Sequence, residues 1–193
     1  MPADTPDLPI VAFADQGQLL AWLDEHGETS QGIRIKFAKK HTGIATVSKA
    51  EAVDAALCHG WIDGQLQPFD GDFWLTRFTP RRPRSVWSEK NRERVSELIA
   101  DGRMTPAGLA QVEAARADGR WDRAYARQST ATVPDDLQAA LDADPAAAAH
   151  FATVNAANRF AVIYRVNDAK RPETRARRIA QLVAMLACGE TLH

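Results

Sequence analysis

The residues best suited to bind a charged ligand are concentrated between positions 60 and 91. This segment combines tryptophan, arginine and hydroxyl side chains with a strand carboxylate, Asp63. Guanidinium groups bind carboxylates and phosphates through paired hydrogen bonds, and aromatic faces attract cations and planar groups. The candidate ligand-binding residues are Trp61, Asp63, Arg77, Thr79, Arg81, Arg82, Ser85, Trp87, Ser88 and Asn91. This composition predicts a site for an anionic or planar group.

Two of these arginines, Arg81 and Arg82, lie in a connector bounded by Pro80 and Pro83. Proline fixes its own φ and restricts the residue before it, so we expect a stiff, extended connector. A helix that begins near residues 85–88 would add free backbone N–H groups, which favour a carboxylate or phosphate. We therefore predict an anion site here. The alternative interpretation is a solvated basic loop that pairs with acidic neighbours.

Asp63 has two interpretations. A carboxylate inside a strand is disfavoured unless it has a partner, so it is either structural or functional. In the structural interpretation Arg77 or Arg81 lies within ion-pair distance and the pair holds the hairpin to the next segment. In the functional one Asp63 contacts a ligand, or acts as a general base beside the arginines. Trp61 and Trp87 likewise fit a core or a ligand platform, since large aromatic residues dominate cores.

Catalytic and cofactor motifs are not found in the sequence. It contains no G-x-S-x-G, no P-loop and no G-x-G-x-x-G. The histidines, none of which has the spacing of metal ligands, are His26, His41, His59, His150 and His193. His59 precedes Gly60, where a structural role at a helix end is expected. We expect no catalytic residue, metal or cofactor, and we favour a binding protein over an enzyme.

Composition and charge restrict the partners. The chain has 193 residues and a formal net charge of -1, so it has no overall attraction for nucleic acid or anionic membranes. A second basic cluster contains Lys170, Arg171, Arg175, Arg177 and Arg178. We interpret it as a solvated helix face, with nucleic-acid binding as the third functional hypothesis.

Targeting signals are not visible either. The first residues lack the basic and apolar regions of a signal peptide, and no apolar run is long enough to span a bilayer. We therefore expect a cytoplasmic protein that is not integral to a membrane. Cys58 and Cys188 stand alone, and we expect both to be small buried side chains rather than a disulfide.

The pattern of elements predicts an α+β fold. Residues 1–84 are expected to form a mixed part with a small antiparallel sheet, including a β-hairpin over 61–78 that turns at Asp70-Gly71. This turn would place Asp63 opposite Phe78. Residues 85–121 are expected to be a helical connector packed on that part, and residues 134–193 a helical C-terminal region.

Three groups of residues resemble the YdeI/OmpD-associated bacterial proteins. They are Gly60-Trp61-Ile62-Asp63-Gly64; Arg77-Phe78-Thr79-Pro80-Arg81-Arg82 with Trp87 and Asn91; and Asn158-Arg159-Phe160 with Lys170-Arg171-Pro172-Glu173-Thr174-Arg175. The resemblance covers nearly the whole chain. It implies a role in bacteriocin protection, tolerance of cationic antimicrobial peptides and envelope stress, and a link to an outer-membrane porin. It implies no set of catalytic residues.

Together these observations predict a protein that binds a small anionic ligand or a protein partner in a stress-tolerance pathway. The alternative is an uncharacterised enzyme that uses Asp63 with nearby arginines. Nucleic-acid binding through the basic clusters is the third hypothesis, which the net charge does not favour.

Overall fold

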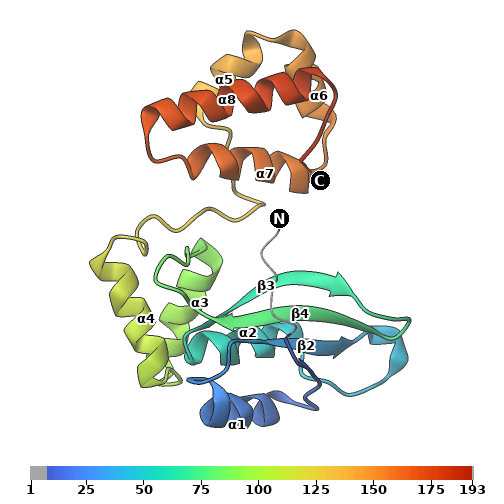
Figure 1. The fold of residues 1–193 in the computed structure, drawn as a ribbon, viewed down its shortest axis with the longest axis vertical. Helices are drawn as coiled ribbons and strands as arrows, with labels where there is room; N and C mark the ends of the chain where they lie inside the picture. Colours follow the sequence, from blue (N-terminus) through green and yellow to red (C-terminus); the bar gives the residue numbers. More distant parts are fainter. Residues whose placement is uncertain (1–7, 193) are drawn as a thin grey trace. The chain divides into compact units, whose positions relative to one another are not determined.

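The computed structural model describes residues 8–192 and divides the chain into two compact units, Met1–Ala124 and Tyr125–His193. The N-terminal unit combines a sheet with helices, and the C-terminal unit is helical (Figure 1). The N-terminal elements are β1 (Ile10–Val11), α1 (Gln16–His26), β2 (Ile33–Ala38), the short 3-10 helix η1 (Lys40–Thr42), α2 (Lys49–Cys58), β3 (Trp61–Pro68), β4 (Phe73–Pro80), α3 (Glu89–Ala100) and α4 (Pro106–Ala117). The C-terminal elements are α5 (Asp135–Asp142), α6 (Pro145–Thr153), α7 (Ala156–Asn167) and α8 (Pro172–Ala187). The α+β class is confirmed.

Helix starts follow from side chains that the sequence already indicates. Asp15 and Thr105 accept backbone N–H groups at the first turns of α1 and α4. Ser48 and Glu51 form a complete capping box at the start of α2. For α3 the cap is Ser88, which accepts the N–H of Asn91 at 3.1 Å.

The sheet has the strand order β1-β2-β4-β3. β2, β4 and β3 are antiparallel, whereas β1 runs parallel to β2, so the expected antiparallel sheet is in fact mixed. The predicted pairing of Asp63 with Phe78 is confirmed. Between Asp63 and Leu66 the register shifts through a β-bulge, which moves the outer half of the hairpin by one residue.

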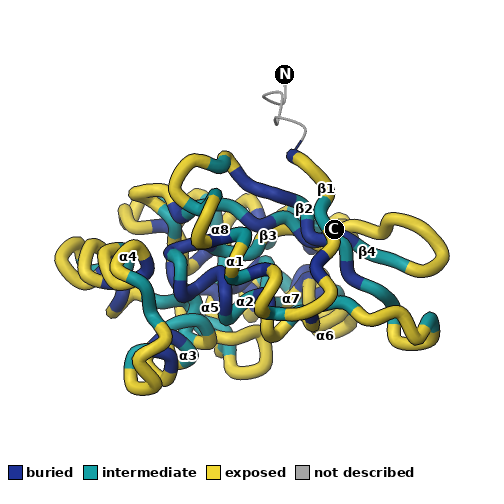
Figure 2. The backbone as a smooth tube through the Cα atoms, turned by 90° about the horizontal axis from the view of Figure 1, so that it is seen from below, coloured by how far each residue is buried: buried dark blue, intermediate teal, exposed yellow. Residues whose placement is uncertain are grey.

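Helix α2 contacts α1, β3, α3 and α4, and it contributes to two cores. Its alanines, Ala52 and Ala55 among them, face a core with α1 and the inner face of the sheet, which includes Phe37 and Trp61. Leu57 and Cys58 face a second core formed with α3, α4 and two tryptophans. Figure 2 colours the backbone by burial: buried residues lie within the sheet, whereas most of α4 is exposed.

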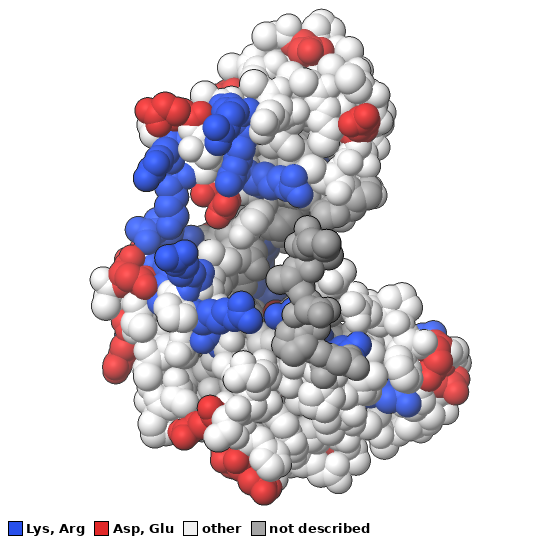
Figure 3. Space-filling view, in the orientation of Figure 1, with Lys and Arg blue, Asp and Glu red and all other residues white. Residues whose placement is uncertain are grey.

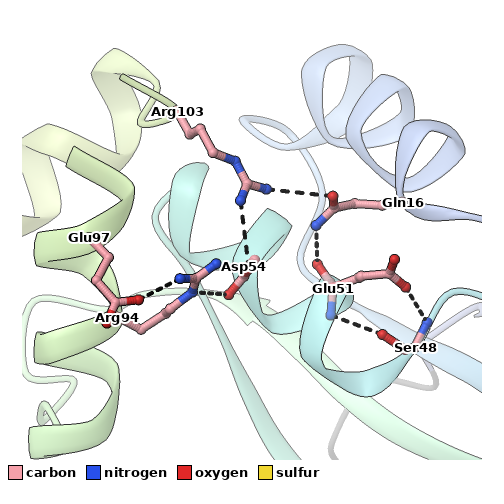
Figure 4. A network of polar contacts seen from close by, with 7 residues as sticks. All are labelled: Gln16, Ser48, Glu51, Asp54, Arg94, Glu97 and Arg103. Atoms are coloured by element: carbon pink, nitrogen blue, oxygen red, sulfur yellow. Dashed lines mark hydrogen bonds and ion pairs between the residues drawn. The ribbon is translucent and has the colours of Figure 1, made fainter. Parts of the chain in front are cut away.

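A polar network joins α2 to α3 at the rim of the second core (Figure 4). Asp54 is 16% exposed and accepts two hydrogen bonds from Arg94, at 2.8 Å and 2.5 Å. Arg103 lies 3.7 Å from the same carboxylate and donates to Gln16 on α1. Arg94 also pairs with the exposed Glu97, and the two carboxylates together raise the pKa of its guanidinium. The network thus orients α3 on α2 through one carboxylate.

The C-terminal unit buries one stripe from each of its four helices. The core contains Leu137, Leu141, Ala147, Phe151, Val162, Ile163, Val166, Ile179, Leu182 and Leu186. Arg175 of α8 donates twice to Asp136 of α5 and once to the Val166 carbonyl, so it joins three helices. These hydrogen bonds hold the pKa of Asp136 below its usual value.

The two cysteines differ. Cys58 is buried as expected, and burial raises the pKa of its thiol. Cys188 is exposed, because it follows the last turn of α8 rather than joining its apolar stripe. None of the described helices is long and apolar enough to cross a membrane.

Replacing Asp54 by alanine is expected to destabilise the N-terminal unit by about 2–3 kcal/mol, because it leaves Arg94 without its largely buried partner. Chemical unfolding followed by tryptophan fluorescence measures this unit alone, since all five tryptophans lie in it. Glu97→Ala is the matched control, and removal of this exposed partner should cost less than about 0.5 kcal/mol. Equal effects of the two changes would contradict the role given to Asp54.

Asp136→Asn is expected to lower the thermal midpoint of the C-terminal unit at neutral pH but not in acid. A folded-state pKa below the unfolded value adds stability above the unfolded pKa, and this stability is lost as pH falls through the folded pKa. The difference between the two proteins should therefore shrink as pH falls below the ordinary aspartate value of 3.8. Far-UV circular dichroism at several pH values measures it, with tryptophan fluorescence identifying the part of the transition that belongs to the N-terminal unit. A pH-independent difference would contradict the linkage.

Candidate functional site

The ten predicted binding residues divide into three groups in the structure. Trp61, Arg81 and Trp87 are buried, whereas Arg82 is exposed. The half-buried residues are Asp63, Arg77, Thr79, Ser85, Ser88 and Asn91. They therefore do not share one open surface.

Asp63 pairs with a residue that the sequence did not indicate. Its carboxylate lies 2.9 Å from Nζ of Lys49, at the start of α2. The same ammonium lies 4.6 Å from the ring centre of Phe78, over its face. Burial lowers the pKa of Lys49, against the opposite effect of Asp63. Lys49 thus takes the place predicted for Arg77 or Arg81.

The strand register explains this partner. Asp63 and Phe78 are directly opposite, so both lie on the sheet face that α2 covers. Arg77 is the neighbour of Phe78 and therefore points to the other face, where it lies opposite Arg34 of β2. In this register Arg77 cannot form an ion pair with a carboxylate on the sheet face that α2 covers.

Arg81 follows the last residue of β4 and is 6% exposed. Its guanidinium carbon lies 3.5 Å from the centre of the Trp87 ring, and Nη1 donates to the Val86 carbonyl at 3.2 Å. Its backbone N–H donates to the carbonyl of Gly60. Arg81 and Trp87 therefore form one stacked pair, as aromatic and guanidinium groups often do.

The connector beyond Arg81 forms a tight turn. The hydroxyl of Ser85 accepts the N–H of Arg82, and the N–H of Ser85 donates to the Arg82 carbonyl. The Ser85 carbonyl accepts Nη1 of Arg120 at 2.9 Å. Arg82 and Arg84 are exposed. This turn fixes the backbone of the predicted anion site and leaves those two side chains at the surface.

A surface hollow of about 380 Å³ lies beside this connector, between the end of α1, the turn from α2 to β3, the end of β4 and the start of α4. Two of the predicted residues, Trp61 and Arg81, line it. Its other charged or titratable side chains are Asp24, Glu28 and His59. The hollow therefore combines apolar, cationic and anionic groups, as small-molecule sites commonly do.

His59 lies at the end of α2, as expected from the sequence, and its ring is fixed by two acceptors. Nδ1 lies 2.9 Å from the Ala55 carbonyl and Nε2 lies 2.8 Å from the Asp24 carboxylate. Both neighbours are acceptors, so the ring makes both hydrogen bonds only when both nitrogens are protonated. The only sequence signal was His59 at the end of α2; Asp24 lies 35 positions away and is brought near by the packing of α1 on α2.

Two glycines allow the chain to pack closely at the hollow and beside it. Gly60 has φ of 73°, and a Cβ there would lie 2.9 Å from Gln111 and 3.0 Å from the Ala107 carbonyl. A Cβ on Gly108 of α4 would lie 2.1 Å from the Cys58 carbonyl. Only glycine allows α4 to lie this close to the end of α2.

Two of the five members of the second basic cluster are paired within the C-terminal unit. Arg175 pairs with Asp136, and Arg178 pairs with Asp168 at 3.0 Å. Lys170, Arg171 and Arg177 are exposed. In Figure 3 blue side chains gather on one side of this unit, with red side chains at their margin. A hollow of about 470 Å³ between α7 and α8 contains the Arg178–Asp168 pair. The described residues contain no group of histidine, cysteine and carboxylate side chains that could hold a metal.

Asp63→Asn is expected to destabilise the N-terminal unit by about 1 kcal/mol, because the pair with Lys49 is partly open to solvent. A double-mutant cycle with Lys49→Met should give a coupling free energy of the same size. The matched cycle with Arg77→Gln should give no coupling, because Arg77 faces the other way. Coupling to Arg77 but not to Lys49 would contradict the observed pairing.

Comparison with known proteins gives matches to two family models. No curated protein and no solved structure matches the chain. The model described as "Bacteriocin-protection, YdeI or OmpD-Associated" matches residues 130–189, which confirms the resemblance within the C-terminal unit. The model described as "Domain of unknown function (DUF8412)" matches residues 11–111, which include the hollow and the connector. Since that match covers more than half of the 193 residues, the chain belongs to the DUF8412 family and carries a YdeI/OmpD-associated segment at its C-terminal end.

Proposed function

We propose that the protein binds a small ligand with an anionic group in the hollow of its N-terminal unit, and that this binding acts in protection against bacteriocins. The single observation that carries the binding proposal is Arg81, a buried arginine that lines a hollow of about 380 Å³. The bacteriocin role comes from the description of the family matched by residues 130–189.

The surroundings of Arg81 support an anionic ligand. Stacking on Trp87 and the bond to Val86 hold the guanidinium in place, so little side-chain entropy is lost on binding. The hollow also includes the first residues of α4, where Ala107 lies at the positive end of the helix dipole. A cation in a partly enclosed, low-dielectric setting attracts an anion more strongly than a solvated surface arginine does.

The acidic residues of the hollow restrict the ligand further. Asp24 lies on α1 and Glu28 in the turn that follows it, and Asp24 is already bonded to His59. A purely anionic ligand would be repelled by Glu28, so the ligand should carry a hydrogen-bond donor or an ammonium group as well as its anionic group. An amino acid has this combination, whereas sulfate does not.

Filling the hollow tests the proposal without removing a buried charge. Ala107→Phe places a ring at the wall of the hollow, on an exposed position of α4. Ala114→Phe, also exposed on α4 but outside the hollow, is the matched control. The probes are glutamate, succinate and sulfate, titrated while tryptophan fluorescence is recorded, because Trp61 lines the hollow.

We expect the wild type and Ala114→Phe to bind glutamate more tightly than succinate or sulfate, and Ala107→Phe to lose at least about tenfold in affinity for glutamate, or about 1.4 kcal/mol. Equal responses of all three proteins would contradict the site. The same three proteins, expressed in a bacteriocin-sensitive strain, test the role. Survival should rise with the wild type and Ala114→Phe but not with Ala107→Phe.

A further inference from the structure

Strand β3 forms one edge of the sheet, and its outer half is uncovered. The strand order β1-β2-β4-β3 leaves β3 with a single neighbour, β4. The opposite edge strand, β1, has only two residues and is too short to pair with another chain. Residues 64–68 of β3 are all exposed, and Leu66 is 58% exposed. Among the described residues, only β4 forms backbone hydrogen bonds with this stretch.

This end of the hairpin also carries exposed apolar side chains. Phe69, in the turn that follows β3, is 45% exposed. Figure 1 shows that the hairpin end extends past α1 and α2, so neither helix covers it. Apolar groups beside unpaired backbone N–H and C=O groups are the features that another strand recognises.

The protection that edge strands normally carry is weak here. Residues 64–68 are Gly64-Gln65-Leu66-Gln67-Pro68, without a single charge. Lysine or glutamate would normally keep such an edge from pairing. The bulge after Asp63 and the missing N–H of Pro68 limit the length that can pair, but they leave Gln65 to Gln67 between them. The geometry therefore permits a short pairing and excludes a long one.

We propose that this edge is the contact surface for a second copy of the chain, through antiparallel pairing of β3 with β3 about a two-fold axis near Leu66. Such pairing is self-complementary. If a residue of one copy contacts a second residue on the partner, the same two residues also make the contact with the copies exchanged. The absence of charge in residues 64–68 removes the like-charge repulsion that two identical edges would otherwise meet. The net charge of -1 adds little repulsion between whole chains.

The two copies of Leu66 would lie side by side and leave water together. Each side chain is more than half exposed in the single chain, so pairing removes apolar surface that is otherwise solvated. The short edge makes this interface small, and the dimer is accordingly weak and dependent on concentration.

Sedimentation velocity on the full chain tests the proposal between about 10 μM and about 1 mM, the range in which small interfaces associate. The wild type should shift from monomer to dimer with concentration. Leu66→Lys puts a charge at the two-fold axis, and Gln65→Pro introduces a proline, which protects edge strands from pairing, so both should raise the dissociation constant at least about tenfold. Leu109→Lys, at an apolar position of α4 that is 36% exposed, is the control and should dimerise like the wild type.

Circular dichroism checks that each variant is folded, and Leu66→Lys, at a side chain that is 58% exposed, keeps the test valid if Gln65→Pro unfolds the hairpin. Hydrogen exchange gives a second readout: amide protection at residues 65–67 should rise with protein concentration in the wild type alone. A wild type that stays monomeric up to about 1 mM overturns the proposal. So does a dimer that Leu66→Lys leaves unchanged, since it would use another surface.

Discussion

The fold of the N-terminal unit depends on α2 being buried from two sides. Its small side chains, Ala52 and Ala55 among them, let the sheet and α1 approach closely, while Leu57 and Cys58 fill the core shared with α3 and α4. Gly108 completes this arrangement, because a Cβ there would lie 2.1 Å from the carbonyl of Cys58. A larger residue at any of these contacts would separate elements that both cores need, since protein interiors are close-packed and relax little. Because the middle of α2 is largely buried, polar side chains gather mainly at its two ends.

Both ends of α2 carry the polar groups that matter for binding and stability. At its start Lys49 pairs with Asp63, which couples the helix to the hairpin. At its end His59 bonds to Asp24 and Gly60 turns the chain into β3, and these residues line the hollow with Arg81. Midway along the helix, Asp54 holds Arg94 of α3. Helix α2 thus positions polar pairs at its start, its middle and its end. The proposed site and the network around Asp54 both depend on this one helix.

The two family matches coincide with different parts of this architecture. Residues 11–111 cover the sheet, the helices α1 to α3 and the first half of α4, whereas residues 130–189 cover the four helices of the C-terminal unit. Each unit has its own core, so each can be treated as a folding unit, and the tryptophans report on the first alone. The family name associated with bacteriocin protection belongs to the segment that lacks the predicted binding residues of 60–91. The proposed function therefore requires both units in one chain.

Local chemistry determined much of this protein from sequence alone. The capping residues Asp15, Ser48 and Thr105 each act within the first turn of their own helix, so their role follows from local sequence. The hairpin and the pairing of Asp63 with Phe78 were also predicted from the sequence, but the β-bulge on which this pairing depends was not, and the turn is longer than the expected two residues. The ion-pair partner of Asp63, the stacking of Arg81 on Trp87 and the bond from His59 to Asp24 were decided by tertiary structure. Each depends on which faces of distant elements meet, and a side chain of the right charge at the right distance in sequence can still point away, as Arg77 does. The alternation of side chains along a strand assigns residues to two faces. It does not say which helix or strand will cover each face, because that depends on how the elements pack.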